Sequence, residues 1–226
     1  MLKINKTIPP HAGEKIHYAG TTIENAAQAM ILIHGRGAAA QSMLAMTDLF
    51  DSQDIIYIMP QAHNLTWYPY RFIEKRETNE PGISSGLTLI HTLVKSVNDA
   101  GIPDEKIYFL GFSQGACLVA DYAARYPSRY GGVFVLSGGL IGDTIRSGEF
   151  SGDLKNTPVF FGCSDSDFHI PAERVDESAY IFEQLNADVT KSIYPDMGHT
   201  INQNEIDFIK KVLLQNQKFW VSSNPL

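Results

Sequence analysis

The stretch Ile107-Tyr-Phe-Leu-Gly-Phe-Ser-Gln-Gly-Ala116 decides the fold of this chain. Residues 106–110 are a short run of apolar, β-prone side chains, which predicts a buried strand. Small residues then recur at helical spacing and predict a helix; they are Ala116, Val119, Ala120, Ala123 and Ala124. Between strand and helix stands the pattern G-x-S-x-G, which is typical of a sharp turn with its middle residue in an uncommon backbone conformation.

The middle residue of this turn, Ser113, is predicted to be a nucleophile. Its hydroxyl is expected at the carboxyl edge of a sheet and at the N-terminus of a helix, where developing negative charge is favoured. The alternative is a glycine-rich loop that merely contains a serine. The strand before the pattern and the helix after it favour the nucleophile.

Length and composition predict a single α/β domain over residues 1–226, with 44% hydrophobic and 19% charged residues. The formal net charge of −7 disfavours nucleic acid or an anionic membrane as the main partner. Residues 1–17 carry no apolar signal core, and no run approaches the roughly 20 apolar residues of a membrane span. Two cysteines, Cys117 and Cys163, are too few for a disulfide framework, so we expect buried free thiols and a cytoplasmic protein.

Strand-like and helix-like segments alternate along the chain and predict one mostly parallel sheet with helices on both faces and no cap domain. The expected strands are 15–19, 29–34, 54–59, 106–110, 132–137, 158–162 and 188–194. The expected helices are 41–50, 83–97, the segment from Ser113 to Pro127, 171–186 and 201–214. Residues 1–13 are expected to be a loose lead-in and residues 61–78 a long loop.

A serine nucleophile needs a base, and seven histidines compete for that role. In enzymes with this strand–serine–helix unit, the order along the chain is nucleophile, acid, histidine. Only His169 and His199 follow Ser113 with an acid between. Because His169 lies two residues after Asp167, it is too close to be oriented by it, so we predict His199 as the base. His34 is instead expected to hold a neighbouring loop.

The acid is expected after the strand at 158–162, where Asp165 and Asp167 are both candidates. Either aspartate is also suited to cap the helix that follows Pro171. Together with His169 they suggest a metal site, but no further carboxylate cluster accompanies them. We therefore predict no metal and no cofactor.

Two backbone N–H groups are predicted to stabilise an oxyanion: that of Gln114, directly after the nucleophile, and that of Arg36, in the loop after the strand ending at His34. The Arg36 guanidinium is expected to face either the substrate or solvent, and solvent is the favoured alternative. Trp67 and Tyr68 are candidate substrate contacts, together with Tyr70 and Phe72, and ordinary packing of the long loop is the alternative.

Four segments together resemble the phospholipase/carboxylesterase group of α/β-hydrolases, which includes acyl-protein thioesterases and small bacterial carboxylesterases. They are His34-Gly35, Gly111-Phe-Ser-Gln-Gly115, Asp167-Phe-His-Ile-Pro171 and Gly198-His199. The resemblance extends from about residue 29 to residue 214 and implies the α/β-hydrolase fold. In that group the acid stands four residues before a proline, which here implies a triad of Ser113, Asp167 and His199.

Two segments depart from this group. The usual His-Gly-Leu-Gly-Asp is here His34-Gly-Arg-Gly-Ala38, and the loop with Trp67-Tyr68-Pro69 differs from the thioesterase form. The leading hypothesis is a serine carboxylester hydrolase for short or medium acyl esters. The alternatives are an acyl thioesterase with the same triad, or a ligand-binding protein without turnover. We expect a small-molecule ester or thioester as partner; Phe219 and Trp220 are expected to pack on the core or on a second subunit in a homodimer.

Overall fold

The structure is a computed structural model that describes residues 2, 4, 7–50 and 52–223, with side chains up to residue 215. Its centre is a seven-stranded sheet with the strand order β1-β3-β2-β4-β5-β6-β7. The strands are β1 (Ile16–Gly20), β2 (Gln28–Ile33), β3 (Ile55–Pro60), β4 (Ile107–Phe112), β5 (Gly132–Leu136), β6 (Pro158–Ser164) and β7 (Asp188–Tyr194). All neighbouring pairs are parallel except β1 with β3, which is the antiparallel edge.

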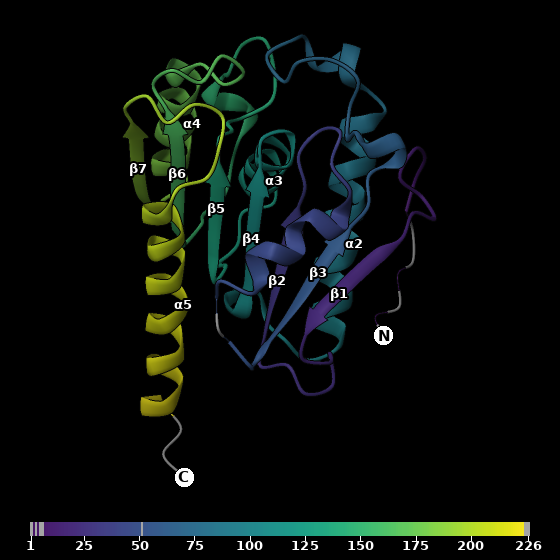
Figure 1. Cartoon of the computed structure of the whole chain (residues 1–226), viewed down its shortest axis with the longest axis vertical. Helices are drawn as coiled ribbons and strands as arrows, with labels where there is room; N and C mark the ends of the chain where they lie inside the picture. Colours follow the sequence, from purple (N-terminus) through teal and green to yellow (C-terminus); the bar gives the residue numbers. More distant parts are fainter. Residues whose placement is uncertain (1, 3, 5–6, 51, 224–226) are drawn as a thin grey trace.

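Helices cover both faces of this sheet (Figure 1). The α-helices are α1 (Leu44–Thr47), α2 (Gly82–Asp99), α3 (Gln114–Arg125), α4 (Ala172–Gln184) and α5 (Gln203–Ser223). Short 3-10 turns are η1 (Ala40–Met43), η2 (His63–Leu65), η3 (Arg76–Asn79), η4 (Asp104–Lys106) and η5 (Ser147–Glu149). Side chains of α2, α3 and α4 share one apolar cluster, and those of η1 and α5 share the other.

Strand β4 shows how the sequence builds both clusters at once. Its side chains alternate, so that Ile107 and Phe109 join the first cluster and Tyr108 and Leu110 join the second. All four are fully buried. A strand that is covered on both faces must be apolar along its whole length, which explains the continuous hydrophobic run that marked it in the sequence.

The predicted mostly parallel sheet with helices on both faces is confirmed, but several segments differ from expectation. The segment around residues 41–50 forms only η1 and the four-residue α1. The lead-in is not loose at His11, which is buried and donates its backbone N–H to Ser85 Oγ at 3.0 Å. Helix α5 continues nine residues past its expected end at Leu214. The side chains of Phe219 and Trp220 lie outside the described part of the chain.

The carboxyl ends of the parallel strands meet at one end of the molecule, and loops from several strands gather there (Figure 1). Ligands of such sheets bind beyond these strand ends. Among the helices of the described residues, none is both long enough and apolar enough to cross a bilayer.

The start of α5 is closed by a reciprocal pair of hydrogen bonds. Glu205 Oε2 accepts the backbone N–H of Asn202 at 2.8 Å, and Asn202 Oδ1 accepts the backbone N–H of Glu205 at 3.1 Å. This is a capping box, which directs the chain from the His199 loop into the helix. The other carboxylate oxygen of Glu205 is buried, has no hydrogen-bond partner among the described residues and faces Gly162, where an added Cβ would lie 2.0 Å away. Burial raises the pKa of Glu205 from 4.5 to about 7.

This raised pKa predicts a pH-dependent loss of stability. Glu205 loses its proton near pH 7 in the folded protein and near pH 4.5 in the unfolded chain. The contribution of this proton to folding stability is therefore fully present below pH 4.5 and is lost as the pH rises through 7. Glu205→Gln removes the titration and keeps a capping amide. We predict that wild-type stability, relative to Glu205→Gln, falls by about 1.4 kcal/mol between roughly pH 6 and roughly pH 8 in urea unfolding. Parallel pH profiles for the two proteins would contradict the assignment.

Candidate active site

Ser113 lies in a strained turn between β4 and α3, with φ 55° and ψ −121°. Its backbone N–H donates to the Leu136 carbonyl of β5 at 3.0 Å. The glycines of the pattern are required by close backbone contacts: a Cβ on Gly115 would lie 2.1 Å from the Ile33 carbonyl oxygen, and one on Gly111 would lie 2.4 Å from that of Gly115. The turn therefore packs directly on the end of β2 and raises the serine hydroxyl above the sheet.

The structure brings Ser113, His199 and Asp167 into one hydrogen-bonded line. His199 Nε2 lies 2.8 Å from Ser113 Oγ, and His199 Nδ1 lies 2.7 Å from Asp167 Oδ2. Because the carboxylate oxygen accepts from Nδ1–H, Nε2 is left free to accept the serine proton. The three residues come from the loops after β4, β6 and β7. This geometry is that of a serine nucleophile beside an oriented base.

Of the two candidate acids, the structure places Asp167 against the imidazole. Asp167 is buried, and its second oxygen accepts the backbone N–H groups of His169 at 2.9 Å and Ile170 at 3.2 Å. Asp165 points elsewhere, with Oδ1 accepting the Asp196 N–H at 2.9 Å. Each aspartate therefore has a separate task in its loop. No group of three or more metal-ligating side chains occurs in the described part of the chain.

The His199 loop is held to β6 by a polar contact that the sequence did not suggest. Ser164 Oγ accepts the backbone N–H of Gly198 at 3.0 Å and is nearly inaccessible. The imidazole of His199 is flanked by the rings of Phe112 and His169, with centroid distances of 5.0 and 4.8 Å. Packing on two sides limits the rotation of the ring out of the hydrogen-bonded line.

His34 holds the loops after β2 and β3 together. It is fully buried, its Nδ1 lies 2.8 Å from the Gly35 carbonyl, and its Nε2 accepts the Ala62 N–H at 3.1 Å. Burial lowers the pKa of His34, which favours the neutral ring that these partners require. His63, the other histidine near these loops, pairs instead with Glu14 at 2.7 Å.

The loop that follows His34 lies directly beside the serine. A Cβ on Gly35 would be 3.3 Å from the Cβ of Ser113. The Gly37 N–H donates to the Leu65 carbonyl at 2.7 Å. Among the hydrogen bonds of the described residues, the backbone N–H groups of Arg36 and Gln114 have no acceptor. The N–H groups of both predicted oxyanion donors are thus not used in the hydrogen bonding of the described residues.

The side chains of Arg36 and Gln114 bind the backbone of residues 67–70, which the sequence did not predict. Arg36 is exposed, as expected, but its guanidinium also binds backbone: Nη1 donates to the Pro69 carbonyl at 2.5 Å and Nη2 to the Tyr70 carbonyl. Gln114 is buried; its Oε1 accepts the Trp67 N–H at 2.8 Å and its Nε2 donates to the Tyr68 carbonyl at 2.8 Å. The sequence signal that could have revealed this role is an amide side chain at the first position of a helix, directly after the predicted nucleophile.

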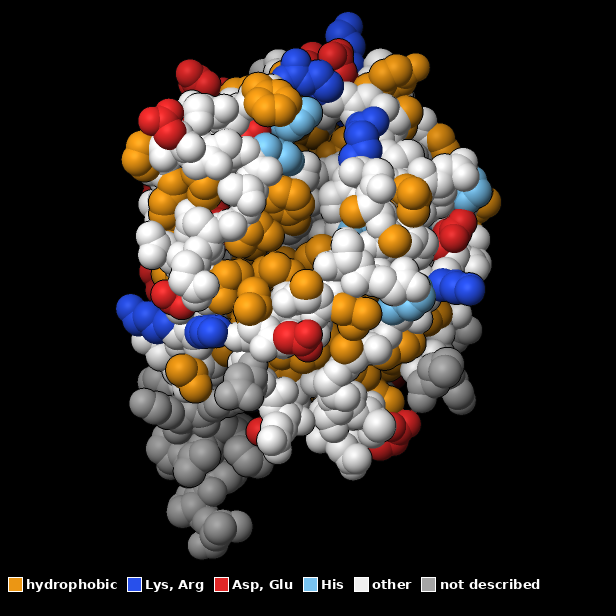
Figure 2. Space-filling model, in the orientation of Figure 1, with side chains coloured by type: hydrophobic (Ala, Val, Ile, Leu, Met, Phe, Trp, Pro, Cys, Tyr) orange, Lys and Arg blue, Asp and Glu red, His pale blue; other side chains and the backbone are white. Residues whose placement is uncertain are grey.

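A cleft of about 880 Å³ opens beside Ser113 and His199. Tyr68, Tyr70 and Phe72, three of the candidate substrate contacts, are among the residues that line it. Trp67 does not line the cleft: it is fully buried and donates Nε1–H to the His34 carbonyl at 2.9 Å, so its expected substrate contact is wrong. Figure 2 shows this face of the molecule hollowed near its exposed histidines, with hydrophobic side chains around the hollow.

Neither cysteine is suited to act as a nucleophile. Cys117 and Cys163 are both buried free thiols. Burial raises the pKa of each thiol to about 12, so that the reactive thiolate is disfavoured.

A sequence profile of the phospholipase/carboxylesterase family matches residues 19–216 of the chain. The chain belongs to the phospholipase/carboxylesterase family. This family assignment makes it a hydrolase. Among solved structures, a phospholipase/carboxylesterase from Dyadobacter fermentans is 37% identical, with a TM-score of 0.87, and the match covers 92% of this chain and all of that one.

Curated relatives are more distant. A probable SOBER1-like carboxylesterase of Arabidopsis thaliana is 25% identical over 65% of this chain, and the match spans 56% of that protein. Acyl-protein thioesterase 1 of Neurospora crassa is 23% identical over 82% of this chain and 85% of that protein. Carboxylesterases and thioesterases thus both occur among the proteins that the chain resembles.

The different positions of the two aspartates predict a clear difference between matched variants. Asp167→Asn replaces the acceptor of His199 Nδ1–H and favours the wrong tautomer, so kcat for aryl-ester hydrolysis should fall by about 10⁴. Asp165→Asn keeps an oxygen for the Asp196 N–H and should lower kcat by less than about threefold. Steady-state kinetics with p-nitrophenyl acetate measure both. Equal losses in the two variants would contradict the placement of the acid.

Proposed function

We propose that the chain is a serine carboxylester hydrolase that acts on short or medium acyl esters through an acyl-enzyme intermediate. The observation that supports this most directly is the hydrogen-bonded line from Ser113 through His199 to Asp167, at 2.8 and 2.7 Å. It stands beside an open cleft at the carboxyl edge of the sheet.

In the first half of the reaction, Ser113 Oγ attacks the acyl carbon while His199 Nε2 takes the hydroxyl proton. Asp167 holds the imidazole through Nδ1–H and stabilises the imidazolium that forms. The tetrahedral intermediate collapses when His199 returns the proton to the leaving alcohol, and Ser113 remains acylated. Water then attacks the acyl group by the same proton transfers in reverse roles, which releases the carboxylic acid and restores the serine.

The negative charge of each tetrahedral intermediate is assigned to the backbone N–H groups of Arg36 and Gln114. Both lack an acceptor among the described residues; Gln114 directly follows Ser113, and Arg36 directly follows Gly35, which lies against Ser113. The Gln114 N–H also opens α3, where the helix dipole favours an anion.

The substrate class is drawn from the cleft. Aromatic side chains of Tyr68, Tyr70 and Phe72 supply apolar contact for an acyl chain, and polar groups of Arg36, Arg71 and Glu74 lie among the lining residues. No cap domain covers the cleft in the described part of the chain. An uncapped site of this kind suits short or medium acyl groups. We keep the cytoplasm as the expected compartment, because both cysteines are buried as free thiols.

Thioester hydrolysis is a second candidate, supported by the similarity to a fungal acyl-protein thioesterase 1. The same serine, histidine and oxyanion donors serve a thioester, since only the leaving atom differs. A ligand-binding protein without turnover is the remaining alternative. Ligand binding alone does not require the alignment of Ser113 with His199, so that alignment favours the hydrolase.

The first prediction of this proposal concerns turnover itself. Ser113→Ala removes the attacking oxygen, so p-nitrophenyl acetate hydrolysis should fall by about 10⁶ in kcat, to the background rate. Circular dichroism of the variant checks that it is folded. Full turnover by the folded variant would rule out the serine mechanism, and an inactive wild type would favour the ligand-binding alternative.

The second prediction concerns the substrate. In a series of p-nitrophenyl esters from acetate to palmitate, kcat/KM should be highest for acyl chains of roughly two to eight carbons, because longer chains extend beyond the aromatic walls of the cleft. Acyl-CoA thioesters of the same lengths provide the matched comparison. A maximum confined to long chains would contradict the acyl-chain assignment, and a clear preference for thioesters would favour the thioesterase.

A further inference from the structure

The segment Thr66–Tyr70, here named the strap, is held by the side chains of the same two residues that are proposed to bind the oxyanion. Gln114 contacts the backbone of Trp67 and Tyr68 at 2.8 Å each. Arg36 donates to the next two carbonyls, those of Pro69 and Tyr70. Four consecutive residues of the strap are therefore bound by two side chains, one from the loop after β2 and one from the first residue of α3.

The strap also has attachments that do not depend on Arg36. The Tyr70 N–H donates to Asn79 Oδ1 at 2.8 Å, and Asn79 is fully buried. The Trp67 indole donates to the His34 carbonyl at 2.9 Å. The strap is therefore already held by other hydrogen bonds. The Arg36 contact joins it to the loop Gly35–Gly37, in which the Arg36 N–H has no acceptor among the described residues.

The bonding of Arg36 itself points to a structural tether. Its guanidinium donates two hydrogen bonds to neighbouring carbonyls, and it makes no ion pair among the described residues. Because the planar guanidinium is bound at two nitrogens, both its orientation and its distance from the strap are fixed. The residue before Arg36, Gly35, lies directly beside Ser113: an added Cβ there would be 3.3 Å from the Ser113 Cβ.

We propose that Arg36 is a positioning residue: its guanidinium ties the oxyanion loop to the strap and thereby holds the Arg36 N–H on the developing oxyanion. The inference rests on the proposed esterase function. It also makes Tyr68 and Tyr70, which line the cleft, part of the same unit as the oxyanion site. A change in the strap is then transmitted to the N–H through Arg36.

A tether of this kind acts on the transition state rather than on substrate binding. Removing one oxyanion donor altogether lowers kcat by about 10² to 10³. Loss of the tether leaves the N–H in place but loosely aimed, so we expect a smaller fall of roughly 10- to 100-fold in kcat, with KM changed less than about threefold.

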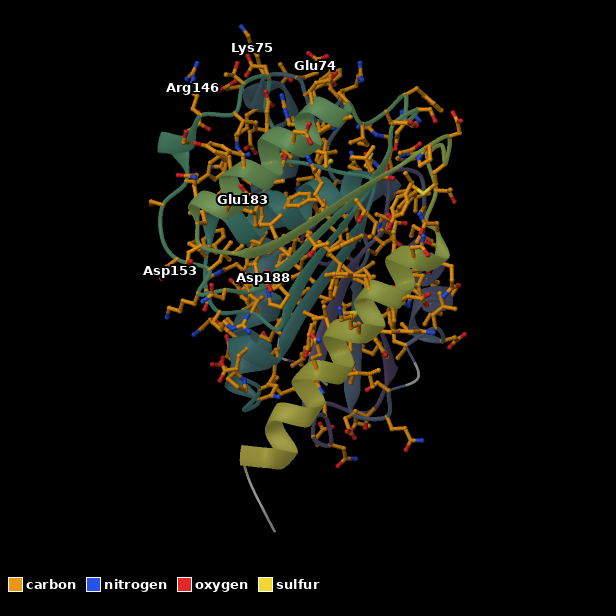
Figure 3. All side chains as sticks on the ribbon, turned by 90° about the vertical axis from the view of Figure 1, so that its left-hand side faces the viewer. Glu74, Lys75, Arg146, Asp153, Glu183 and Asp188 are labelled. Atoms are coloured by element: carbon orange, nitrogen blue, oxygen red, sulfur yellow. The ribbon has the colours of Figure 1, made fainter. Side chains whose placement is uncertain are left out.

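The test uses the full chain and four variants. Arg36→Met keeps the apolar stem and removes both donors, whereas Arg36→Lys keeps one donor and the charge. Arg71→Met removes a second arginine that lines the cleft and whose guanidinium has no partner among the described residues. Arg146→Met is the surface control; Arg146 lies outside the cleft lining and projects from the same end of the molecule (Figure 3).

Two measurements are made on each protein: kcat and KM for p-nitrophenyl acetate, and the rate of chymotrypsin cleavage after Tyr70, which is 58% exposed. Arg36→Met should show the predicted fall in kcat and cleavage faster by roughly tenfold, since two hydrogen bonds to the strap are lost. Arg36→Lys should lie between Arg36→Met and wild type. Arg71→Met should alter KM alone, and Arg146→Met should match wild type in both measurements.

Three results would overturn the proposal while leaving the esterase function intact. They are a wild-type kcat in Arg36→Met, a reduced kcat with unchanged cleavage at Tyr70, and an equal fall in kcat in Arg71→Met, which would assign the effect to charge. Should Arg36→Met not fold, the intermediate values expected of Arg36→Lys decide the matter. An inactive but folded wild type would instead refute the esterase function.

Discussion

The close approach of α3 to the end of β2 is the constraint on which the site depends. Gly115 touches the Ile33 carbonyl so tightly that a Cβ would lie 2.1 Å from that oxygen. This contact leaves Ser113 at φ 55°, with its hydroxyl directed above the sheet rather than into the core. The strain is local, and it is maintained by buried strands on both sides. Loops after β6 and β7 then need only bring Asp167 and His199 to the height of that hydroxyl.

A second layer of polar contacts surrounds the three aligned side chains and explains why they remain aligned. Asp167 is held by two backbone N–H groups, and the His199 loop is held by Ser164. The capping box of Asn202 and Glu205 directs the chain from this loop into α5. The buried Glu205 oxygen of this cap has no hydrogen-bond partner in the part of the chain that the structure describes, so we expect Glu205 to make folding stability depend on pH without taking part in the proposed proton transfers. Stability and turnover therefore respond to pH through different groups.

Much of this arrangement could be predicted from the sequence, because it follows from short-range patterns. The strand–turn–helix unit around Ser113 is predicted by the apolar run of β4, the glycines of the turn and the small residues of α3. The alternation of strands and helices predicts that the functional loops lie at one edge of the sheet. The choice between Asp165 and Asp167 was beyond such patterns: both follow the same strand, and only the family spacing favoured Asp167. The structure separates them by their partners, Asp196 for one and His199 for the other.

Other features depend on long-range packing, which spacing does not encode. Trp67 looked like a substrate contact because it stands in a polar, aromatic loop, yet its indole is used to bind the His34 carbonyl in the core. Arg36 is a surface cation as expected, but nothing in the sequence indicated that it binds carbonyls more than thirty residues away along the chain. His11 was placed in a loose lead-in, although its buried ring contacts the Trp67 carbonyl at 3.0 Å.

Reaction with a fluorophosphonate probe tests the central claim most directly, because only a serine activated by its neighbours attacks phosphorus at a useful rate. The folded protein is incubated with the probe, and the adduct is located by peptide mass spectrometry in wild type and in His199→Ala. The account predicts one adduct, on Ser113, that forms at least about 10³ times more slowly without the imidazole. No adduct on the folded wild-type protein, or an adduct on another residue with Ser113 unmodified, would contradict it.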